Sequence, residues 1–366
     1  MVNVQCQCSM NNNRLLSLDI LRGITVAGMI LVNNGWGESF EMLEHSKWNG
    51  MTPCDLVFPF FLFIMGISCY LSLVKSEFKP TPQVIRRIVK RTVLLFAIGL
   101  FINWFDHAIE GDLLCFGHLR IWAVMQRIAV CYGIVSLFAL FCNHKYTIPV
   151  VIGLLVIYAA ILVLGNGYAE DASVNVLAQV DLSLFGYDHL YHKSPVDPEG
   201  LLGTISSVAH VLLGFYCGRL IRQKQTVGEK VIALFVVGTV LVIGGYLLSY
   251  GLPLNKRIWS PSYVMVTCGL ASLLQAFLMY LIDIREKKDW TAFFHVFGVN
   301  ALALYVSSEL LAILLGHIGF SEIVYNGIHA VIPPLKWASL AYALYFVLLN
   351  FAFGYILYKK KIYIKL

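Results

Sequence analysis

Ten long apolar segments constrain the fold more than any other feature of this sequence. A helix rises about 1.5 Å per residue, so segments of this length can cross about 30 Å of hydrocarbon. The mean hydropathy of +0.74 and the 13% content of charged residues agree with a membrane location. The sequence therefore predicts an all-α, polytopic integral membrane bundle of about ten helices, forming one domain over residues 14–366 behind a flexible leader at 1–13. The expected spans are 15–35, 56–74, 83–104, 119–142, 147–165, 201–221, 229–250, 259–283, 291–318 and 337–358.

Lys and Arg residues are distributed unevenly between the two ends of these spans. With a cytoplasmic N-terminus, twenty of the 27 fall at the cytoplasmic end, six fall at the opposite end and Arg127 lies within a span. Positive residues gather on the cytoplasmic side of membrane proteins. We therefore expect both termini in the cytoplasm. The net charge of +6 indicates membrane topology rather than a nucleic-acid partner.

A polar loop between the first two spans carries the residues most suggestive of catalysis. His45 and Asp55 lie at the mouth of a membrane helix, after Asn33 and Asn34 at the end of the preceding span. Ionisable groups at a membrane edge are costly to hold and are often functional. A carboxylate can orient an imidazole, and an amide can donate to a developing oxyanion. We expect His45 to be a catalytic base or acyl carrier; an interfacial anchor beside Trp48 is the alternative interpretation.

The other loops expected at the same end suit a polar ligand. The longest, 165–200, combines six carboxylates with Tyr and His residues, and the loop 253–260 places several donors next to a Trp. Carboxylates beside aromatic rings recognise hydroxyl-rich or amine-bearing ligands. A merely solvated loop has the same composition, so this remains one of two interpretations.

Basic residues form one face at the start of the third span. Arg86, Arg87, Lys90 and Arg91 recur at three- and four-residue spacing. Contact with anionic lipid is one interpretation, and a phosphate clamp for a nucleotide such as coenzyme A is the other. Arg127, inside the fourth span, is expected to face the bundle interior and to find a partner there.

The nine cysteines indicate neither a disulfide framework nor a metal site. Most lie inside apolar spans, where Cys packs as a small hydrophobic residue. Cys6 and Cys8 form a C-x-C in the leader without a second pair at zinc-like spacing.

Several motifs resemble the heparan-alpha-glucosaminide N-acetyltransferase family of transmembrane acetyltransferases and its bacterial relatives. They occur in register across the ten spans. They are Ser17-Leu18-Asp19-x-x-Arg22-Gly23, Val32-Asn33, His45-x-x-Trp48-Asn49-Gly50, Asp55-Leu56-Val57-Phe58-Pro59, Leu119-Arg120-Ile121 with Gln126-Arg127, Asp197-Pro198-Glu199-Gly200-Leu201-Leu202-Gly203-Thr204, and Asn255-Lys256-x-x-Trp259-Ser260-x-x-Tyr263.

The resemblance implies an enzyme that uses cytosolic acetyl-CoA to acetylate the amine of a terminal glucosamine on the opposite side of the membrane. The family's active-site His maps onto His45 and its Asn onto Asn33. The loop between them is one residue longer here, which makes Asn34 a rival. On loops and motifs together, we expect substrate contacts from Trp48, Asn49, Asp197, Glu199, Asn255, Lys256 and Trp259, and acetyl-CoA contacts from Arg87, Lys90, Arg91, Arg120, Gln126 and Arg127.

The chain starts directly at the first span, which favours a bacterial homologue in the cytoplasmic (inner) membrane. For a bacterial homologue the resemblance alone does not establish a lysosomal location or heparan sulfate as acceptor. The acceptor sugar, N- or O-acetylation, and direct transfer or an acetyl-His intermediate therefore stay open. A sugar permease without acyl-transfer chemistry and a lipid-handling membrane protein are the alternatives. Membrane lipid is an expected partner, and a homodimer is compatible with such a chain.

Overall fold

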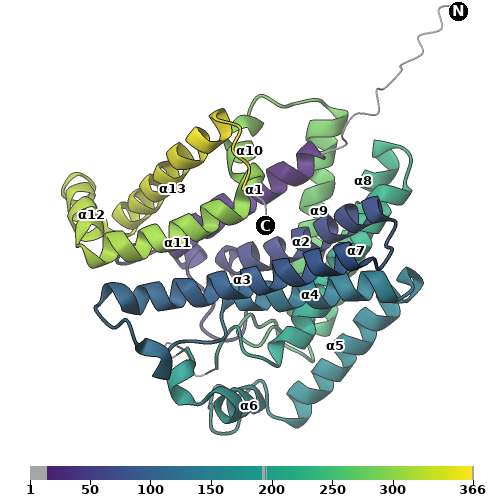
Figure 1. The fold of residues 1–366 in the computed structure, drawn as a ribbon, viewed down its shortest axis with the longest axis horizontal. Coiled ribbons are helices and arrows are strands. Elements are labelled where there is room, and N and C mark those ends of the chain that lie inside the picture. The colour runs from purple at the N-terminus through teal and green to yellow at the C-terminus, as the bar shows by residue number, and fades with distance from the viewer. Residues whose placement is uncertain (1–14, 192–193, 195, 365–366) are drawn as a thin grey trace, which may run out of the picture.

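Helices dominate the computed structural model, which describes residues 15–191, 194 and 196–364 (Figure 1). No β-strand occurs within these residues. The predicted leader, 1–13, lies outside them. The helices are α1 Leu16–Asn33, α2 Val57–Leu73, α3 Pro82–Ile109, α4 Val124–Phe141, α5 Thr147–Leu164, α6 Val176–Phe185, α7 Gly203–Gln223, α8 Val227–Leu248, α9 Pro261–Met279, α10 Thr291–Val299, α11 Ala301–His317, α12 Phe320–Val331 and α13 Leu335–Lys359.

The polytopic helical membrane bundle predicted from the sequence is confirmed. In the described part of the chain, nine helical segments are long and apolar enough to cross a membrane, and one bent pair raises the number to ten. The pair is α10 and α11, which meet at an angle of 83°. The span expected over 291–318 thus consists of two helices with a bend between them.

Asn300 lies at the bend between α10 and α11 and makes two hydrogen bonds to the chain after α13. Its Nδ2 donates to the carbonyl of Ile362 (2.9 Å) and its Oδ1 accepts from the amide of Ile364 (3.0 Å). The chain after α13 is thus bound at the break. Gly298 lies so close to α1 that an added Cβ would come within 2.0 Å of the carbonyl oxygen of Asp19. Broken helices in membranes occur where protein, rather than lipid, surrounds the interrupted backbone.

Helix α7 lies at the centre of the bundle with most of its residues buried, and α3 and α8 lie at its periphery with few buried residues. Small residues allow α2 to approach α7 closely. A Cβ on Gly66 would come within 2.1 Å of the carbonyl of Val211, and one on Gly214 within 2.1 Å of the carbonyl of Phe63. Close packing at small residues is the usual way that membrane helices associate.

Several connecting loops meet at one end of the bundle, which we call the loop end. Trp48 Nε1 donates to the carbonyl of Tyr168 (2.9 Å), and the amide of Gly50 donates to the carbonyl of Leu254 (2.7 Å). Because successive spans alternate in direction, the basic segment at the start of α3 lies at the opposite end.

Two segments expected to be loops contain helices, α6 and α12. In Figure 1, α6 lies at the edge of the bundle below α5.

Helix α4 begins at Val124, five residues later than the expected span. The preceding residues are held outside the helix, because the carbonyl of Arg120 accepts from Asn103 Nδ2 (2.7 Å) and the amide of Ile121 donates to the carbonyl of His189 (3.4 Å). Arg127 therefore lies in the first turn of α4, near the loop end, and not deep within a span.

Candidate functional site

Asp55 is fixed by the turn that starts the second span. The 3₁₀ turn Pro53–Leu56 leads directly into α2, with Pro53 at its first position. Asp55 is fully buried, and its Oδ2 accepts from the backbone amides of Thr52 (3.0 Å) and Ser46 (3.2 Å). These charge-assisted bonds hold a carboxylate without exposed surface in one orientation.

His45 binds the other oxygen of this carboxylate. Its Nδ1 lies 2.8 Å from Asp55 Oδ1, and its side chain is 47% exposed. A carboxylate accepts hydrogen bonds, so Nδ1 carries the proton and Nε2 carries the free lone pair. The arrangement presents a half-exposed, oriented imidazole, which is the geometry of a general base or a nucleophile.

Lys256 adds a cation beside the ring. Its Nζ lies 3.0 Å from Nδ1 and 2.9 Å from Nε2 of His45, and 3.7 Å from Asp55 Oδ1. The two ring nitrogens of His45 direct their N–H bond and lone pair away from each other in the plane of the ring. A single atom about 3 Å from both nitrogens therefore lies over the ring face, and the in-plane lone pair of Nε2 stays open. Burial lowers the pKa of Lys256, and the charge of Asp55 opposes that effect. Asn255 aligns this loop through Asn49, with Nδ2 3.2 Å from Oδ1.

The two rival Asn residues at the end of α1 differ in their surroundings. Asn33 is exposed, and its Nδ2 donates to Glu309 Oε1 (3.1 Å). Asn34 is buried, and its Nδ2 donates to the carbonyl of Ile30 (2.7 Å), within its own helix. The amide hydrogen bond of Asn34 is therefore local, whereas that of Asn33 reaches a second helix.

The two Trp residues expected to contact substrate are both buried. Trp48 is 6% exposed, and Trp259 has no exposed surface. Trp259 has a φ of 52° and packs edge-on against Phe58 and Tyr263. These rings support the two loops that carry His45 and Lys256, and neither presents a face to solvent.

Arg120, Asp197 and Glu199 form a buried ion cluster at the loop end. Arg120 lies 2.6 Å from Asp197 Oδ1 and 2.9 Å from Glu199 Oε2, with its guanidinium over the ring of Tyr191. Burial, together with the charge of Glu199, raises the pKa of Asp197. The structure thus separates Arg120 from the basic residues of α3, with which it was grouped as an acetyl-CoA contact.

Arg127 and Gln126 also lie near the loop end. Arg127 Nη2 donates to the carbonyl of Gly200 (2.8 Å), and its guanidinium lies 5.2 Å from the centre of the Trp259 ring. Both amide atoms of Gln126 are buried without a hydrogen-bond partner among the described residues. Arg127 therefore connects the start of α4 to the segment that carries Glu199.

A cavity of about 390 Å³ lies between α1, α2, α3, α4 and the break between α10 and α11. Arg22, Arg87 and Arg91 line it, whereas Lys90 is exposed and does not. Arg22 donates to Asp19 (2.8 Å) and to Ser68 (2.9 Å), and Arg91 lies over the ring of Tyr132 with its buried Nε unpaired among the described residues. A cationic, partly apolar cavity suits an anionic ligand with a long uncharged arm.

Two residues beside the site were missed by the sequence reasoning. Cys54 Sγ lies 3.1 Å from His45 Nδ1, and Glu309 binds Asn33. Nothing in the sequence of its loop distinguished Cys54 as a candidate site residue. Glu309 could have been recognised, because it is the only acidic residue in the apolar segment 291–318 and intramembrane carboxylates are frequently functional.

Comparison with known proteins agrees with this architecture. The family described as "Heparan-alpha-glucosaminide N-acetyltransferase, catalytic" matches residues 14–252, more than half of the chain. Heparan-alpha-glucosaminide N-acetyltransferase of Mus musculus is 28% identical over 356 residues, covering 82% of this chain and 54% of the mouse protein. The Homo sapiens protein of that name is 29% identical over 361 residues, covering 81% and 53%. The chain thus spans about half the length of these relatives, and it belongs to the heparan-alpha-glucosaminide N-acetyltransferase catalytic family.

Proposed function

We propose that this protein transfers an acetyl group from acetyl-CoA to the amine of a glucosamine-type sugar, with His45 as catalytic base or acetyl carrier. The observation that carries the proposal is the His45–Asp55 pair, in which a buried carboxylate orients a half-exposed imidazole. Membership of the family supports acyl transfer, and the names of the relatives indicate an amino-sugar acceptor.

As a general base, His45 takes the proton of the attacking amine. The amine nitrogen adds to the thioester carbon while Nε2 accepts its proton, and Asp55 stabilises the imidazolium that forms. The C–S bond then breaks, and the coenzyme A thiolate leaves with that proton. Lys256 Nζ lies next to both ring nitrogens, and its charge would stabilise the oxyanion that develops on a thioester held at His45.

As an acetyl carrier, His45 reacts in two steps. Nε2 attacks the thioester carbon, the C–S bond breaks, and the coenzyme A thiolate leaves. The amine then attacks the acetyl-imidazole, the new C–N bond forms, and the released imidazole takes the amine proton. Both routes need the Nε2 lone pair that the bond between Nδ1 and Asp55 leaves free.

The cationic cavity is the proposed acetyl-CoA site, with Arg87 and Arg91 near the phosphates. Phe61, Ser68 and Ser72 of the second span line it. Phe61 is six residues from Asp55, about 9–10 Å of helical rise, and Ser72 is about 16 Å further along the axis. The cavity thus extends from the basic end of the bundle toward His45. The excess of Lys and Arg supports assigning the cavity end to the cytoplasm and His45 to the opposite side of the membrane.

Proteoliposomes supplied with acetyl-labelled acetyl-CoA and glucosamine test the proposal. We expect label in the sugar, and no transfer by His45→Ala, whereas His317→Ala, a change at an exposed His at the end of α11, should behave as wild type. Glucosamine uptake without label transfer would support a permease instead.

Asp55→Asn gives a second, independent test. The single oxygen of an Asn amide would accept from the backbone amides of Ser46 and Thr52, and its NH₂ group would then face His45 Nδ1. Nδ1 would have to accept this hydrogen bond, so the proton of the imidazole should move to Nε2. We expect kcat to fall by about 10³–10⁴, equal to about 4–5.5 kcal/mol in activation free energy. A kcat within tenfold of wild type, with the fold intact, would remove Asp55 from the orienting role.

A further inference from the structure

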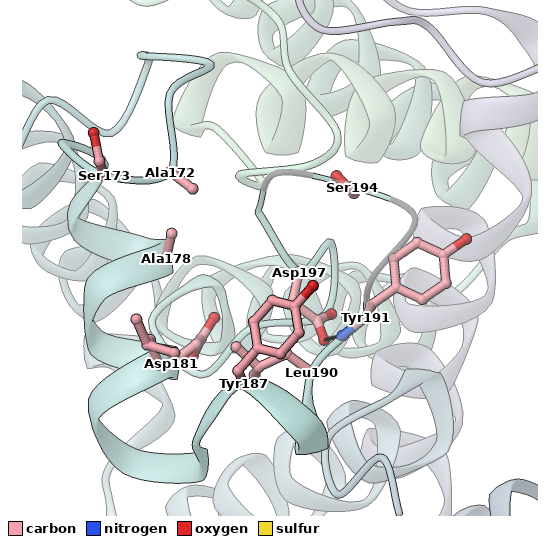
Figure 2. A pocket seen from close by; sticks show the side chains of 10 residues that line it. Ala172, Ser173, Ala178, Asp181, Tyr187, Leu190, Tyr191, Ser194 and Asp197 are labelled. Carbon is pink, nitrogen blue, oxygen red and sulfur yellow. Dashed lines mark hydrogen bonds between the residues drawn. The ribbon is translucent and has the colours of Figure 1, made fainter. Parts of the chain in front are cut away.

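Cavities at the two ends of the bundle differ in the charge of the residues that line them. Beside α6 at the loop end, one cavity is lined by the carboxyls Asp181 and Asp197 (Figure 2). Asp181 accepts from the amide of Leu201 (2.9 Å), and Asp197 pairs with Arg120. At the opposite end, a cavity of about 400 Å³ is lined by cationic and aromatic side chains. We call this cavity the basic-end pocket.

The basic-end pocket lies where three spans end. The last turn of α2, the turn that follows it, the end of α4 and the last turns of α7 surround it. Its volume is within the range of about 300–1,000 Å³ that is usual for small-molecule sites. The lining residues that matter for its chemistry are Tyr70, Phe78, Cys142, His144, Lys145 and Arg219.

Tyr70 places this pocket on a different side of α2 from the cavity proposed for acetyl-CoA. Ser68 and Ser72 of α2 line the acetyl-CoA cavity. Each residue of an α-helix is turned by about 100° from the one before, so Tyr70 points about 200° away from both serines. No described residue lines both cavities. A ligand of the basic-end pocket is therefore separate from the proposed donor.

Arg219 supplies the partly buried cation of the pocket. Its Nη1 donates to the carbonyl of His144 (2.9 Å), and it forms no ion pair with a carboxylate among the described residues. A guanidinium has five N–H donors, and its planar fork matches the oxygens of a phosphate group. Arg219 can therefore donate to an anion and keep its contact with His144.

The loop after α4 supplies a second cation. The ring of His144 packs against Phe78, with ring centroids 4.3 Å apart, and its Nε2 donates to the carbonyl of Ala139 (2.9 Å). These contacts fix the loop. Lys145, the next residue, is exposed, and its Nζ lies 4.9 Å from the centre of the Tyr146 ring without an ion pair in the described part of the chain.

Carboxylates in the neighbouring segments have partners of their own. Glu77, in the turn after α2, lies 2.6 Å from Lys79 Nζ. Glu229, at the start of α8, accepts from the amide of Gln225 (3.1 Å). Neither carboxylate lines the pocket, so Arg219 and Lys145 are available to a negatively charged ligand.

An exposed apolar stripe on α4 leads to the pocket. Ile134, Leu137 and Phe141 are exposed, and their spacing of three and four residues places them on one face of the helix. Phe141 directly precedes Cys142, which lines the pocket. Because α4 is apolar and long enough to cross a membrane, this stripe suits contact with acyl chains. A cationic pocket at the end of such a stripe matches the two parts of a phospholipid.

We propose that the basic-end pocket binds one anionic phospholipid, with its phosphate at Arg219 and Lys145 and an acyl chain along the stripe on α4. A headgroup that also carries a cation gains less from these two residues than one with net negative charge. The pocket lies at the end of the bundle with most of the Lys and Arg, as on the cytoplasmic side of membrane proteins, and cytoplasmic leaflets contain anionic lipids. This inference does not depend on acetyl transfer.

Native mass spectrometry of the detergent-purified protein measures the lipid preference. The probes are phosphatidylglycerol and phosphatidylcholine with the same acyl chains, because both contain a phosphate and only the first has a net negative charge. We expect phosphatidylglycerol to bind at least tenfold more tightly. Equal binding of the two lipids would overturn the proposal.

Cys142 provides a readout within the pocket itself. Its thiol is exposed, whereas the other six cysteines in the described part of the chain are buried. Modification by a maleimide, followed by peptide mapping, measures how fast this thiol reacts. We expect phosphatidylglycerol to slow the reaction at least fivefold, and phosphatidylcholine, inorganic phosphate and acetyl-CoA at the same concentration to leave it unchanged. Equal protection by inorganic phosphate or acetyl-CoA would assign the pocket to a soluble anion and overturn the proposal.

Variants test the two cations separately. Arg219→Gln should weaken binding of phosphatidylglycerol at least tenfold, and Lys145→Gln about fivefold. Lys145 is exposed, so its replacement guards against misfolding. Lys287→Gln is the matched control, because it removes an exposed positive charge at the same end of the bundle and outside the lining. Equal weakening by Lys287→Gln, or none by Arg219→Gln and Lys145→Gln, would refute the assignment to this pocket.

Discussion

Replacing Asp181, a buried carboxyl on α6, with Asn should stabilise the protein at alkaline pH. Burial raises the pKa of Asp181 to about 6, compared with about 3.9 for an exposed Asp. At 1.36 kcal/mol per pKa unit, a shift of about 2 units costs about 3 kcal/mol of folding free energy once the carboxyl is ionised in both states. An Asn amide carries no charge, and its oxygen can still accept from Leu201.

The sign of the pH dependence follows from which state has the higher pKa. Below about pH 3 the carboxyl is protonated in both the folded and the unfolded chain, so ionisation costs nothing. The cost grows as pH rises through 6, reaching about half its full value at pH 5 and almost all of it at pH 8. The stabilisation by Asp181→Asn should therefore be about twice as large at pH 8 as at pH 5.

Thermal unfolding in detergent at pH 5 and pH 8 measures this difference. Asp188→Asn is the control, since its carboxyl is exposed and its replacement should leave the melting temperature nearly unchanged. An Asp181→Asn variant that melts below wild type at pH 8, or that is stabilised by the same margin at both pH values, would show that ionisation of Asp181 does not cost folding free energy.

Three further substitutions test other parts of the molecule. Arg91→Gln removes a guanidinium from the cavity, so it should raise KM for acetyl-CoA about tenfold without changing KM for glucosamine. Lys90→Gln, at an exposed residue outside the lining, is the control, and an unchanged KM for acetyl-CoA in Arg91→Gln would refute the phosphate site. Arg120→Met should cost about 3–5 kcal/mol of stability, because it leaves two buried carboxylates without their cation; a wild-type melting temperature would contradict this. Glu309→Leu should lower kcat about tenfold if its bond to Asn33 positions a catalytic amide, and an unchanged kcat would remove Asn33 from the site.

Sequence alone predicted the parts of the structure that depend on local patterns. Hydropathy gave the spans to within a few residues, because the length of an apolar run decides whether it crosses a membrane. The proximity of His45 and Asp55 followed from their short separation in one loop. The contact of Lys256 with His45 joins residues 211 positions apart. The alternation of the spans placed their two loops at the same end, but it did not predict which side chains would meet.

Features that depend on distant contacts were not predictable in this way. Hydropathy reports how apolar a segment is and not whether its helix bends, so it does not predict the break at Asn300. The contacts of the Asn300 side chain are with the backbone at Ile362 and Ile364, more than 60 residues away in the chain. The late start of α4 likewise depends on Asn103 and His189, which hold the preceding residues outside the helix. Because the expected span began at residue 119, Arg127 was expected well inside it. Helix α4 begins at Val124, so Arg127 lies in its first turn.

The second span links the two halves of the proposed reaction. Asp55 lies at its loop end, and Ser68 and Ser72 line the cationic cavity toward its other end. A donor that enters from the cavity must bring its thioester to a fixed distance from His45, because displacement of reacting groups by about 1 Å can cost about a hundredfold in rate. The close backbone approach of α2 to α7 at Gly66 and Gly214 holds α2 in place within the bundle, since tightly packed helices resist sliding. The carboxylate that orients the imidazole and one wall of the proposed donor cavity therefore belong to the same firmly packed span.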